Sequence, residues 1–424
     1  MKFYLEWYGC TANKNDAEIA VSLLEKAGFT RIFDENNADF FVIFTCIVKG
    51  PTEEKIRYRI KKLSEYDKPV IVVGCMPKTY PERVRQLYDK ISLVGPFDID
   101  KIVDAVKNAI NGKYVDFISS ERMNKINVPH VRFNPVVEIV QISSGCLLDC
   151  TYCATKLSRG NLVSYSIEDI VKRVRNSLID GVREIWITSQ DNSVYGFDFG
   201  KDLADLINKI SVFDERYFIR NGMMNPTFLG RYIDKLIEAY KNDHVFKFLH
   251  LCVQSGSDKV LCDMKRGYQA ADFIRQVKTF RESIPELTLS TDIIVGYPTE
   301  TESDFEETVK LIERIKPDII NLSKFWPRPL TEAYKLPQLP RKIIDERARV
   351  LHEIINEIKI RRNEKWIGWS GEIIVDEIGK NGTYMGRNSA YKPVVVKSDE
   401  NLFGKFVEVE VVEAKSNYLI GQLV

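Results

Sequence analysis

The sequence predicts an α/β protein made of an N-terminal parallel α/β domain, a central open (βα)6 partial barrel and a small C-terminal antiparallel β-barrel. Two observations predict this. Strand-like and helix-like runs alternate through most of the chain, which is typical of parallel sheets covered by helices. After Gly371 the pattern changes to short β runs separated by turn residues. We expect domains at 1–112, 136–366 and 367–424, with a connector at 113–135.

The N-terminal region shows the alternation most clearly. Apolar strand candidates occur at 2–8, 39–45, 69–74 and 91–95, and each is followed by a helical pattern, at 15–27, 53–66, 81–90 and 100–110. Residues 113–135 are polar and lack a clear period, so they are expected to form the connector.

The central region repeats the alternation six times. Its strand candidates are 138–142, 184–188, 217–223, 247–253, 288–295 and 318–323. The first long helix has a clear start and end, because Ser166 can cap it and Gly181 can terminate it. Six βα units predict a partial barrel whose active site lies at the carboxyl ends of the strands.

The last part of the chain begins with a predicted helix at 341–366. Short strands are then expected at 372–377, 382–386, 392–396, 406–414 and 418–424. A small barrel of this kind is an architecture often used to bind nucleic acids.

Composition excludes several classes of protein. Lys and Arg total 61 against 60 Asp and Glu, so the chain has no overall basic field and any RNA binding must depend on local patches. The N-terminus lacks a secretory signal, and the longest apolar runs, Phe40–Phe44 and Pro69–Met76, are far shorter than a membrane span. We therefore expect a cytoplasmic protein without a membrane partner, whose eight cysteines are not disulfides.

The strongest motif is Cys146-Leu-Leu-Asp-Cys150-Thr-Tyr-Cys153, directly after the first barrel strand. Three thiolates at this spacing can hold three irons of a [4Fe–4S] cluster and leave one iron open. The open iron is where S-adenosylmethionine (SAM) could chelate and receive one electron. The alternatives are a zinc knuckle or unrelated core cysteines, but zinc needs a fourth ligand and the next histidine is His244.

A second set of cysteines shares one structural position. Cys10, Cys46 and Cys75 each follow a predicted strand of the N-terminal sheet. The carboxyl ends of parallel strands meet at one edge, so the three thiols can converge into a second three-thiolate site. The alternative is that each is a buried apolar residue. Cys252, Cys262 and the four dispersed histidines are expected to be structural, and His250 is the only histidine expected near the site.

Two separate three-cysteine sets followed by a small β domain resemble the radical SAM methylthiotransferase family. The strings that carry the resemblance include YGCTANKNDAE, TCIVKGPTEEK, VVGCMP, SSGCLLDCTYCATKLSRG, VQSGSDKVLCDMKRGY and KFWPRP. The string KGPTE points to the MtaB-like branch of tRNA enzymes. The C-terminal barrel is similar to a TRAM domain, a small RNA-binding barrel.

The resemblance implies insertion of sulfur at C2 of N6-threonylcarbamoyladenosine, next to the anticodon at tRNA position 37, followed by S-methylation. It implies SAM and two [4Fe–4S] clusters: Cys146, Cys150 and Cys153 would bind the SAM cluster, and Cys10, Cys46 and Cys75 an auxiliary cluster that supplies sulfur. The implied partners are the tRNA anticodon loop, a sulfur donor and an electron donor such as a flavodoxin or ferredoxin.

Three positions depart from the family pattern. Ile47 replaces a small residue, Cys252 replaces a proline, and LTEAYKL follows the Pro-Arg-Pro string. None is a proposed cluster ligand. Two other functions stay open: methylthiolation of a protein side chain, and RNA binding by a protein whose clusters are structural or sense redox state.

Further contacts are predicted from position alone, and no catalytic side chain is predicted beyond the cluster ligands. Polar groups at strand ends can reach the ribose or amino group of SAM, and an aromatic ring in the cysteine loop can lie against its adenine. The candidates are Tyr152, Gln190, Asp191, Gln254, Ser255 and Asp292. In the C-terminal barrel, cations and aromatic rings can contact phosphates and stack on bases; the candidates are Lys380, Tyr384, Arg387 and Lys392.

Overall fold

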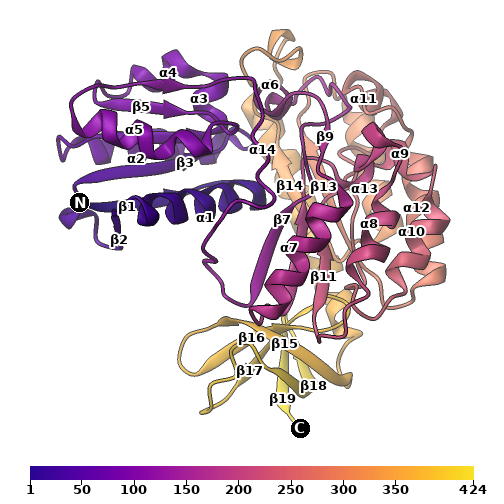
Figure 1. Cartoon of the computed structure of the whole chain (residues 1–424). Helices are drawn as coiled ribbons and strands as arrows, with labels where there is room; N and C mark the ends of the chain where they lie inside the picture. Colours follow the sequence, from indigo (N-terminus) through magenta and orange to yellow (C-terminus); the bar gives the residue numbers. More distant parts are fainter.

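The computed structural model describes all 424 residues, and its N-terminal part is a parallel sheet with helices on both faces (Figure 1). The strand order is β2-β1-β3-β4-β5-β6. The elements are β1 (Lys2–Trp7), α1 (Thr11–Lys26), β2 (Thr30–Ile32), β3 (Phe40–Thr45), α2 (Gly50–Ser64), β4 (Val70–Gly74), α3 (Cys75–Thr79), α4 (Pro81–Arg85), β5 (Ile91–Val94), α5 (Ile102–Ile110) and β6 (Asp116–Phe117).

The four predicted N-terminal strands are all present, and the differences occur at the edges of the sheet. β2 and β6 were not expected, because two or three residues are too short to show a period. β6 lies inside the predicted connector at 113–135, where Asp116 pairs with Leu93 of β5, so the connector is not free of regular structure. The helix expected at 81–90 ends at Arg85.

The central part contains six parallel strands in two sheets, β11-β10-β7 and β12-β13-β14. Isolated bridges from Ile219 to Val245 and from Met224 to Leu251 join the sheets into one open arc, as a partial barrel requires. The elements are β7 (Val137–Gln141), β8 (Ser143–Ser144), α6 (Ala154–Arg159), β9 (Val163–Ser164), α7 (Ile167–Ile179), β10 (Glu184–Thr188), α8 (Leu203–Ile210), β11 (Phe218–Asn221), α9 (Pro226–Leu229), α10 (Ile233–Tyr240), β12 (Phe248–His250), α11 (Asp258–Asp263), α12 (Ala270–Ser283), β13 (Thr288–Val295), α13 (Glu302–Ile315), β14 (Ile319–Lys324) and α14 (Arg341–Glu364).

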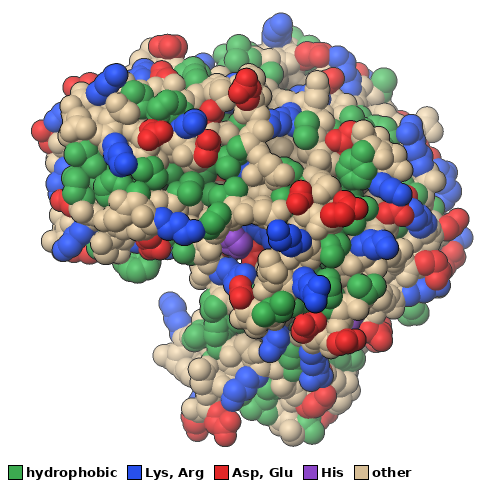
Figure 2. Space-filling view, in the orientation of Figure 1, with side chains coloured by type: hydrophobic (Ala, Val, Ile, Leu, Met, Phe, Trp, Pro, Cys, Tyr) green, Lys and Arg blue, Asp and Glu red, His purple; other side chains and the backbone are tan.

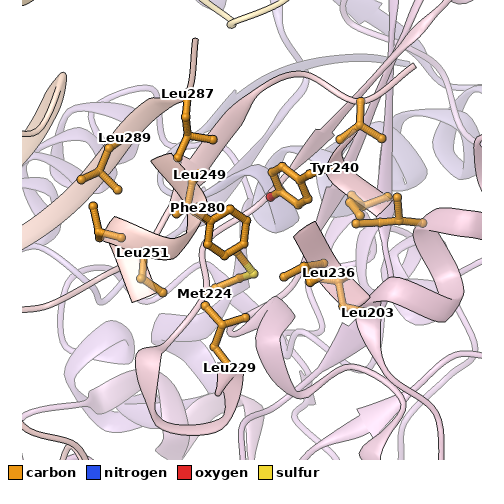
Figure 3. Packing of buried hydrophobic residues seen from close by; sticks show 14 of the residues in the cluster. Leu203, Met224, Leu229, Leu236, Tyr240, Leu249, Leu251, Phe280, Leu287 and Leu289 are labelled. Carbon is orange, nitrogen blue, oxygen red and sulfur yellow. The ribbon is translucent and has the colours of Figure 1, made fainter. Parts of the chain in front are cut away.

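Helices cover the outside of this arc. Figure 3 shows Leu249 of β12 and Leu289 of β13 facing Phe280 of α12, and all three side chains are fully buried. The predicted cap at the start of α7 is present, since Ser166 accepts a hydrogen bond from the Asp169 backbone. The main core of the protein therefore lies between the barrel strands and their helices.

The C-terminal part is a closed five-stranded barrel in the order β15-β16-β17-β19-β18. Its strands are β15 (Ser370–Ile378), β16 (Thr383–Arg387), β17 (Pro393–Lys397), β18 (Phe406–Ala414) and β19 (Leu419–Leu423). One detail of the prediction is wrong: β17 and β19 pair in parallel, so the barrel is not wholly antiparallel. Closure requires this pairing, because β19 crosses back to the free edge of β17.

The C-terminal barrel docks under the amino ends of the central strands (Figure 1). Tyr391 and Ile374 of this barrel pack with Val137 of β7 and Phe248 of β12 in one buried cluster. The opposite, carboxyl ends of the strands are therefore left for the N-terminal domain and the site. No helix in the structure combines the length and apolar character needed to cross a membrane.

Candidate active site

A cavity of about 880 Å³ lies at the carboxyl ends of the central strands, where it faces the N-terminal domain. Cys146, Cys150 and Cys153 line it from the barrel side, and Cys10 lines it from the N-terminal sheet. One member of the second cysteine set thus lies in the same cavity as all three cysteines of the radical motif, whereas Cys46 and Cys75 do not line it. This shared position is the main geometric finding at the site.

The radical motif forms a tight loop between β8 and α6. Gly145 has φ +84°, and a Cβ there would lie 1.9 Å from the Asn161 carbonyl oxygen, so only glycine fits. Gln190 holds the loop by accepting a hydrogen bond from the Gly145 backbone at 2.6 Å. Cys153 is the N-cap residue of α6. Burial raises the pKa of the Cys146 thiol to about 12, with Asp191 adding to the effect.

The second cysteine set follows the carboxyl ends of neighbouring strands of the N-terminal sheet. Cys10 occupies the N-cap position of α1 without a capping side-chain hydrogen bond, Cys46 follows β3 directly, and Cys75 begins α3. A Cβ on Gly9 would lie 2.8 Å from the Cys46 sulfur, which shows how closely β1 and β3 bring their ends together. Burial, followed by the charges of Cys10 and Cys75, raises the pKa of Cys46 to about 12.

The two halves of the site are held together by a buried polar network. Asp16 of α1 is fully buried and accepts hydrogen bonds from Lys125 at 2.6 Å and from Gln141 of β7 at 2.9 Å. Arg159 of α6 donates to the same carboxylate at 3.0 Å. Ala154, next to Cys153, packs in the apolar cluster that contains Cys46 and Cys75. The N-terminal domain and the radical motif are therefore fixed relative to each other.

Arg266 contacts the radical motif directly. Its guanidinium lies 3.4 Å from the Cys150 sulfur and 3.3 Å from the Tyr152 hydroxyl, and it donates to the Cys252 carbonyl at 3.1 Å. Arg266 is buried in the cavity wall. Sequence reasoning missed this residue, although it stands in the Lys-Arg-Gly-Tyr end of a string already used for the resemblance.

Five of the six predicted SAM contacts line the cavity: Tyr152, Gln190, Asp191, Gln254 and Asp292. Asp191 is the best placed, because one carboxylate oxygen is held by Ser193 and Asn225 while the other is buried without a partner. Burial raises its pKa above the usual value. Ser255 does not line the cavity; it is fully buried beside Thr308 at 3.3 Å, so its predicted contact with SAM is contradicted.

His250, Cys252 and Asp292 form a compact group, of which Asp292 lines the cavity. His250 lies 3.1 Å from Asp292, and the Cys252 thiol donates to the same carboxylate at 2.8 Å. Burial alone would raise the pKa of Asp292, but these hydrogen bonds and the charge of His250 lower it to about 2. The proximity of His250 to the site agrees with the sequence expectation, whereas Cys252 is more than a core residue because it orients Asp292.

The four predicted RNA contacts divide into two pairs. Lys380 is exposed and Tyr384 is half-buried on the C-terminal barrel, so both can reach a ligand. Lys392 is 3% exposed, and its ammonium bonds Asp318 at 2.9 Å. Arg387 bonds Asp376 and Glu377 in a largely buried setting. The structure therefore contradicts an RNA contact by Lys392 and argues against one by Arg387, since both side chains stabilise the docked barrel.

The donor sets fit iron–sulfur clusters. Each set offers three sulfur ligands and no fourth protein ligand, which leaves one iron of a cubane available. Buried N–H groups without partners occur on Arg159 and Arg328 near the second set, and anionic sulfur would satisfy them. The residues present thus agree with the groups that the sequence implies.

Comparison with known families agrees with this geometry. Residues 140–312 match the radical SAM superfamily, 2–95 match the uncharacterized protein family UPF0004, and 369–424 match the TRAM domain. A probable threonylcarbamoyladenosine tRNA methylthiotransferase of Pyrococcus abyssi is 40% identical over 426 residues, covering 100% of this chain and 99% of that protein. The threonylcarbamoyladenosine tRNA methylthiotransferase of Mus musculus is 37% identical over 99% of this chain and 74% of its own length.

The chain belongs to the threonylcarbamoyladenosine tRNA methylthiotransferase family. SAM and [4Fe–4S] clusters are accordingly its cofactors, and it is a radical SAM enzyme. Among solved structures, the radical SAM methyltransferase TsrM of Kitasatospora setae aligns with a TM-score of 0.57 at 13% identity, covering 78% of this chain and 75% of that one. At that identity the likeness concerns the fold alone.

Proposed function

We propose that this methylthiotransferase inserts sulfur at C2 of N6-threonylcarbamoyladenosine at tRNA position 37 and then methylates the sulfur, giving 2-methylthio-N6-threonylcarbamoyladenosine. The observation that carries the proposal is the shared cavity, because Cys10 and the three cysteines of the radical motif line the same 880 Å³ space. A hydrogen-abstracting centre and a sulfur source must both reach one base, and only a common cavity allows this.

The two cysteine sets have different tasks in this proposal. Cys146, Cys150 and Cys153 hold the SAM cluster, and Cys10, Cys46 and Cys75 hold the auxiliary cluster. When bound, these groups supply the electron that cleaves SAM and the sulfur that is transferred. Asp191 presents its free carboxylate oxygen to SAM, while Arg266 fixes Cys150 and Tyr152. Arg328 and Trp326 line the cavity where the N-terminal domain meets the barrel, and Arg328 pairs with Glu53 of α2.

tRNA contacts are proposed on the exposed face of the TRAM domain. Lys380 lies in the β15–β16 hairpin, and Lys397 is the neighbour of Thr383 across β16 and β17. Neither lysine forms a salt bridge, so both remain available to phosphates. The target base lies in a single-stranded loop, so it can enter the cavity without being pulled from a duplex. A low-potential electron donor such as a flavodoxin or ferredoxin and a separate sulfur donor complete the proposed set of partners.

The test is nucleoside mass spectrometry on a host that lacks this gene and is complemented with variants. The wild-type chain should convert threonylcarbamoyladenosine to its methylthio form. A Cys10→Ala, Cys46→Ala, Cys75→Ala chain should accumulate the unmodified nucleoside while still cleaving SAM in vitro, because the other set lies in a separate domain. Normal methylthio product from that triple variant would refute the sulfur-delivery role. An unchanged tRNA profile together with a methylthiolated protein would favour the protein-substrate alternative.

A further inference from the structure

Arg159 reaches from the radical motif into the N-terminal cysteine site. It is the last residue of α6 and is 1% exposed. One terminal nitrogen donates to Asp16 at 3.0 Å and to the Asn13 side chain at 3.3 Å, while the other has no partner. The Asn13 amide lies 3.4 Å from the Cβ positions of both Gly9 and Gly74. These glycines precede Cys10 and Cys75, so Arg159 is linked through Asn13 to the turns that carry both cysteines.

Arg328 approaches the same site from another side. It is 3% exposed, lines the cavity, and forms an ion pair with Glu53 of α2 through one terminal nitrogen. Its other terminal nitrogen is buried without a partner. Trp326, two residues earlier, packs directly on Gly50, where any Cβ would lie 2.2 Å from the indole ring. Gly50 begins α2, four residues after Cys46, so the Trp326 packing and the Glu53 ion pair hold Arg328 against the first turn of α2.

Both arginines are buried, and each keeps one terminal nitrogen without a hydrogen-bond partner. Both also line the cavity that Cys10 lines. A buried N–H without a partner is rare and unfavourable. Two of them on residues that line the same cavity as Cys10 indicate an anionic acceptor there.

We propose that Arg159 and Arg328 are redox-tuning residues of the auxiliary cluster, and that each directs its unpartnered N–H to a sulfur of the cluster held by Cys10, Cys46 and Cys75. The inference rests on the auxiliary-cluster assignment proposed above. Hydrogen bonds and positive charge at cluster sulfurs raise the reduction potential. Neither arginine belongs to the N-terminal domain, so the potential of its cluster is set by docking of the radical SAM domain.

The test uses the full chain with Cys146, Cys150 and Cys153 replaced by Ala, so that only the auxiliary cluster is observed. Redox titration followed by electron paramagnetic resonance gives its midpoint potential. Arg159→Gln and Arg328→Gln should each lower the ratio of reduced to oxidised cluster at a fixed potential by about tenfold. For a one-electron couple this corresponds to a midpoint potential that is lower by about 59 mV. The Lys variants should recover most of the shift, because they keep the charge.

Arg347→Gln is the matched control. Arg347 is also buried, pairs with Glu300 and Glu302, and has an unpartnered Nε, but it does not line the cavity. Its replacement should leave the potential unchanged.

Unchanged potentials in both Gln variants would overturn the proposal. Loss of the cluster in a Gln variant but not in its Lys counterpart would support the proposal. Loss of the cluster in both variants would overturn it, because a positive charge at that position would then not be enough to hold the cluster. A parent chain that binds no iron would instead show that the auxiliary-cluster assignment itself is wrong.

Discussion

Gly9 offers a direct test of the auxiliary site. Gly9→Ala places a Cβ 2.5 Å from the Cys46 Cβ and 2.8 Å from its sulfur. An ordinary contact begins at 3.4 Å, so the sulfur must move by about 0.6 Å. Metal sites tolerate about 0.2 Å in ligand distance. We therefore expect Gly9→Ala to lose the auxiliary cluster, so that iron content after anaerobic reconstitution falls from about eight to about four per chain.

A second glycine provides the control for backbone strain. Gly28 has φ +89°, close to the +105° of Gly9, but a Cβ there has nothing within 4 Å. Both alanine variants should lose about 1–2 kcal/mol of stability from the left-handed conformation, and only Gly9→Ala should lose iron. SAM cleavage to 5′-deoxyadenosine should survive in both. A Gly9→Ala chain that keeps about eight irons would show that Cys46 is not a ligand in this arrangement.

Three further predictions concern the charged residues. Lys392→Met should cost about 3 kcal/mol in chemical denaturation, because it leaves Asp318 buried with one partner fewer. Burial raises the pKa of Asp318, but Lys392 and Arg362 outweigh burial and lower it overall, so the Lys392–Asp318 pair stabilises the fold above the unfolded pKa near 3.9 and this contribution is lost on acidification. The Met variant should therefore lose less stability than the wild-type chain as the pH falls below about 5. An unchanged acid profile would contradict this role of the pair. Lys380→Gln with Lys397→Gln should weaken tRNA binding and reduce the salt slope by about two, as measured by anisotropy at several salt concentrations; an unchanged slope would place the RNA contacts elsewhere. Arg266→Met should slow SAM cleavage while auxiliary iron is retained, and a normal rate would show that its contact with Cys150 is only structural.

The cysteine sets could be predicted because their signal is local. C-x3-C-x2-C fixes one site by spacing, and a cysteine after each of three buried strands fixes the other by the geometry of parallel sheets. The shared cavity of Cys10 and the radical motif could not be predicted, because it depends on how α6 packs against α3. The same applies to Arg159, whose role becomes visible only through a missing hydrogen bond.

The errors in the sequence analysis have a common physical cause. Lys392 lies next to a short strand and has the pattern of a solvated cation, yet docking of the C-terminal barrel buries it against Asp318. Ser255 follows a strand end, but the chain turns it toward Thr308 and away from the cavity. Side-chain direction and domain docking are long-range properties. A residue's position at a strand end therefore identifies candidates for a site but does not decide among them.

The position of the TRAM domain limits how tRNA can bind. TRAM packs at the amino ends of the barrel strands, and the cavity lies at their carboxyl ends. β13, Thr288–Val295, is long enough to separate these ends by about 25 Å at 3.3 Å per residue. One base in the cavity cannot also touch TRAM, so TRAM must hold a more distant part of the tRNA. Figure 2 shows the surface hollowed between the N-terminal domain and TRAM, where a nucleic-acid stem can lie alongside both. The contribution of TRAM to tRNA affinity should therefore be the same for tRNA with and without the threonylcarbamoyl group. Discrimination between the two tRNAs must come from the cavity.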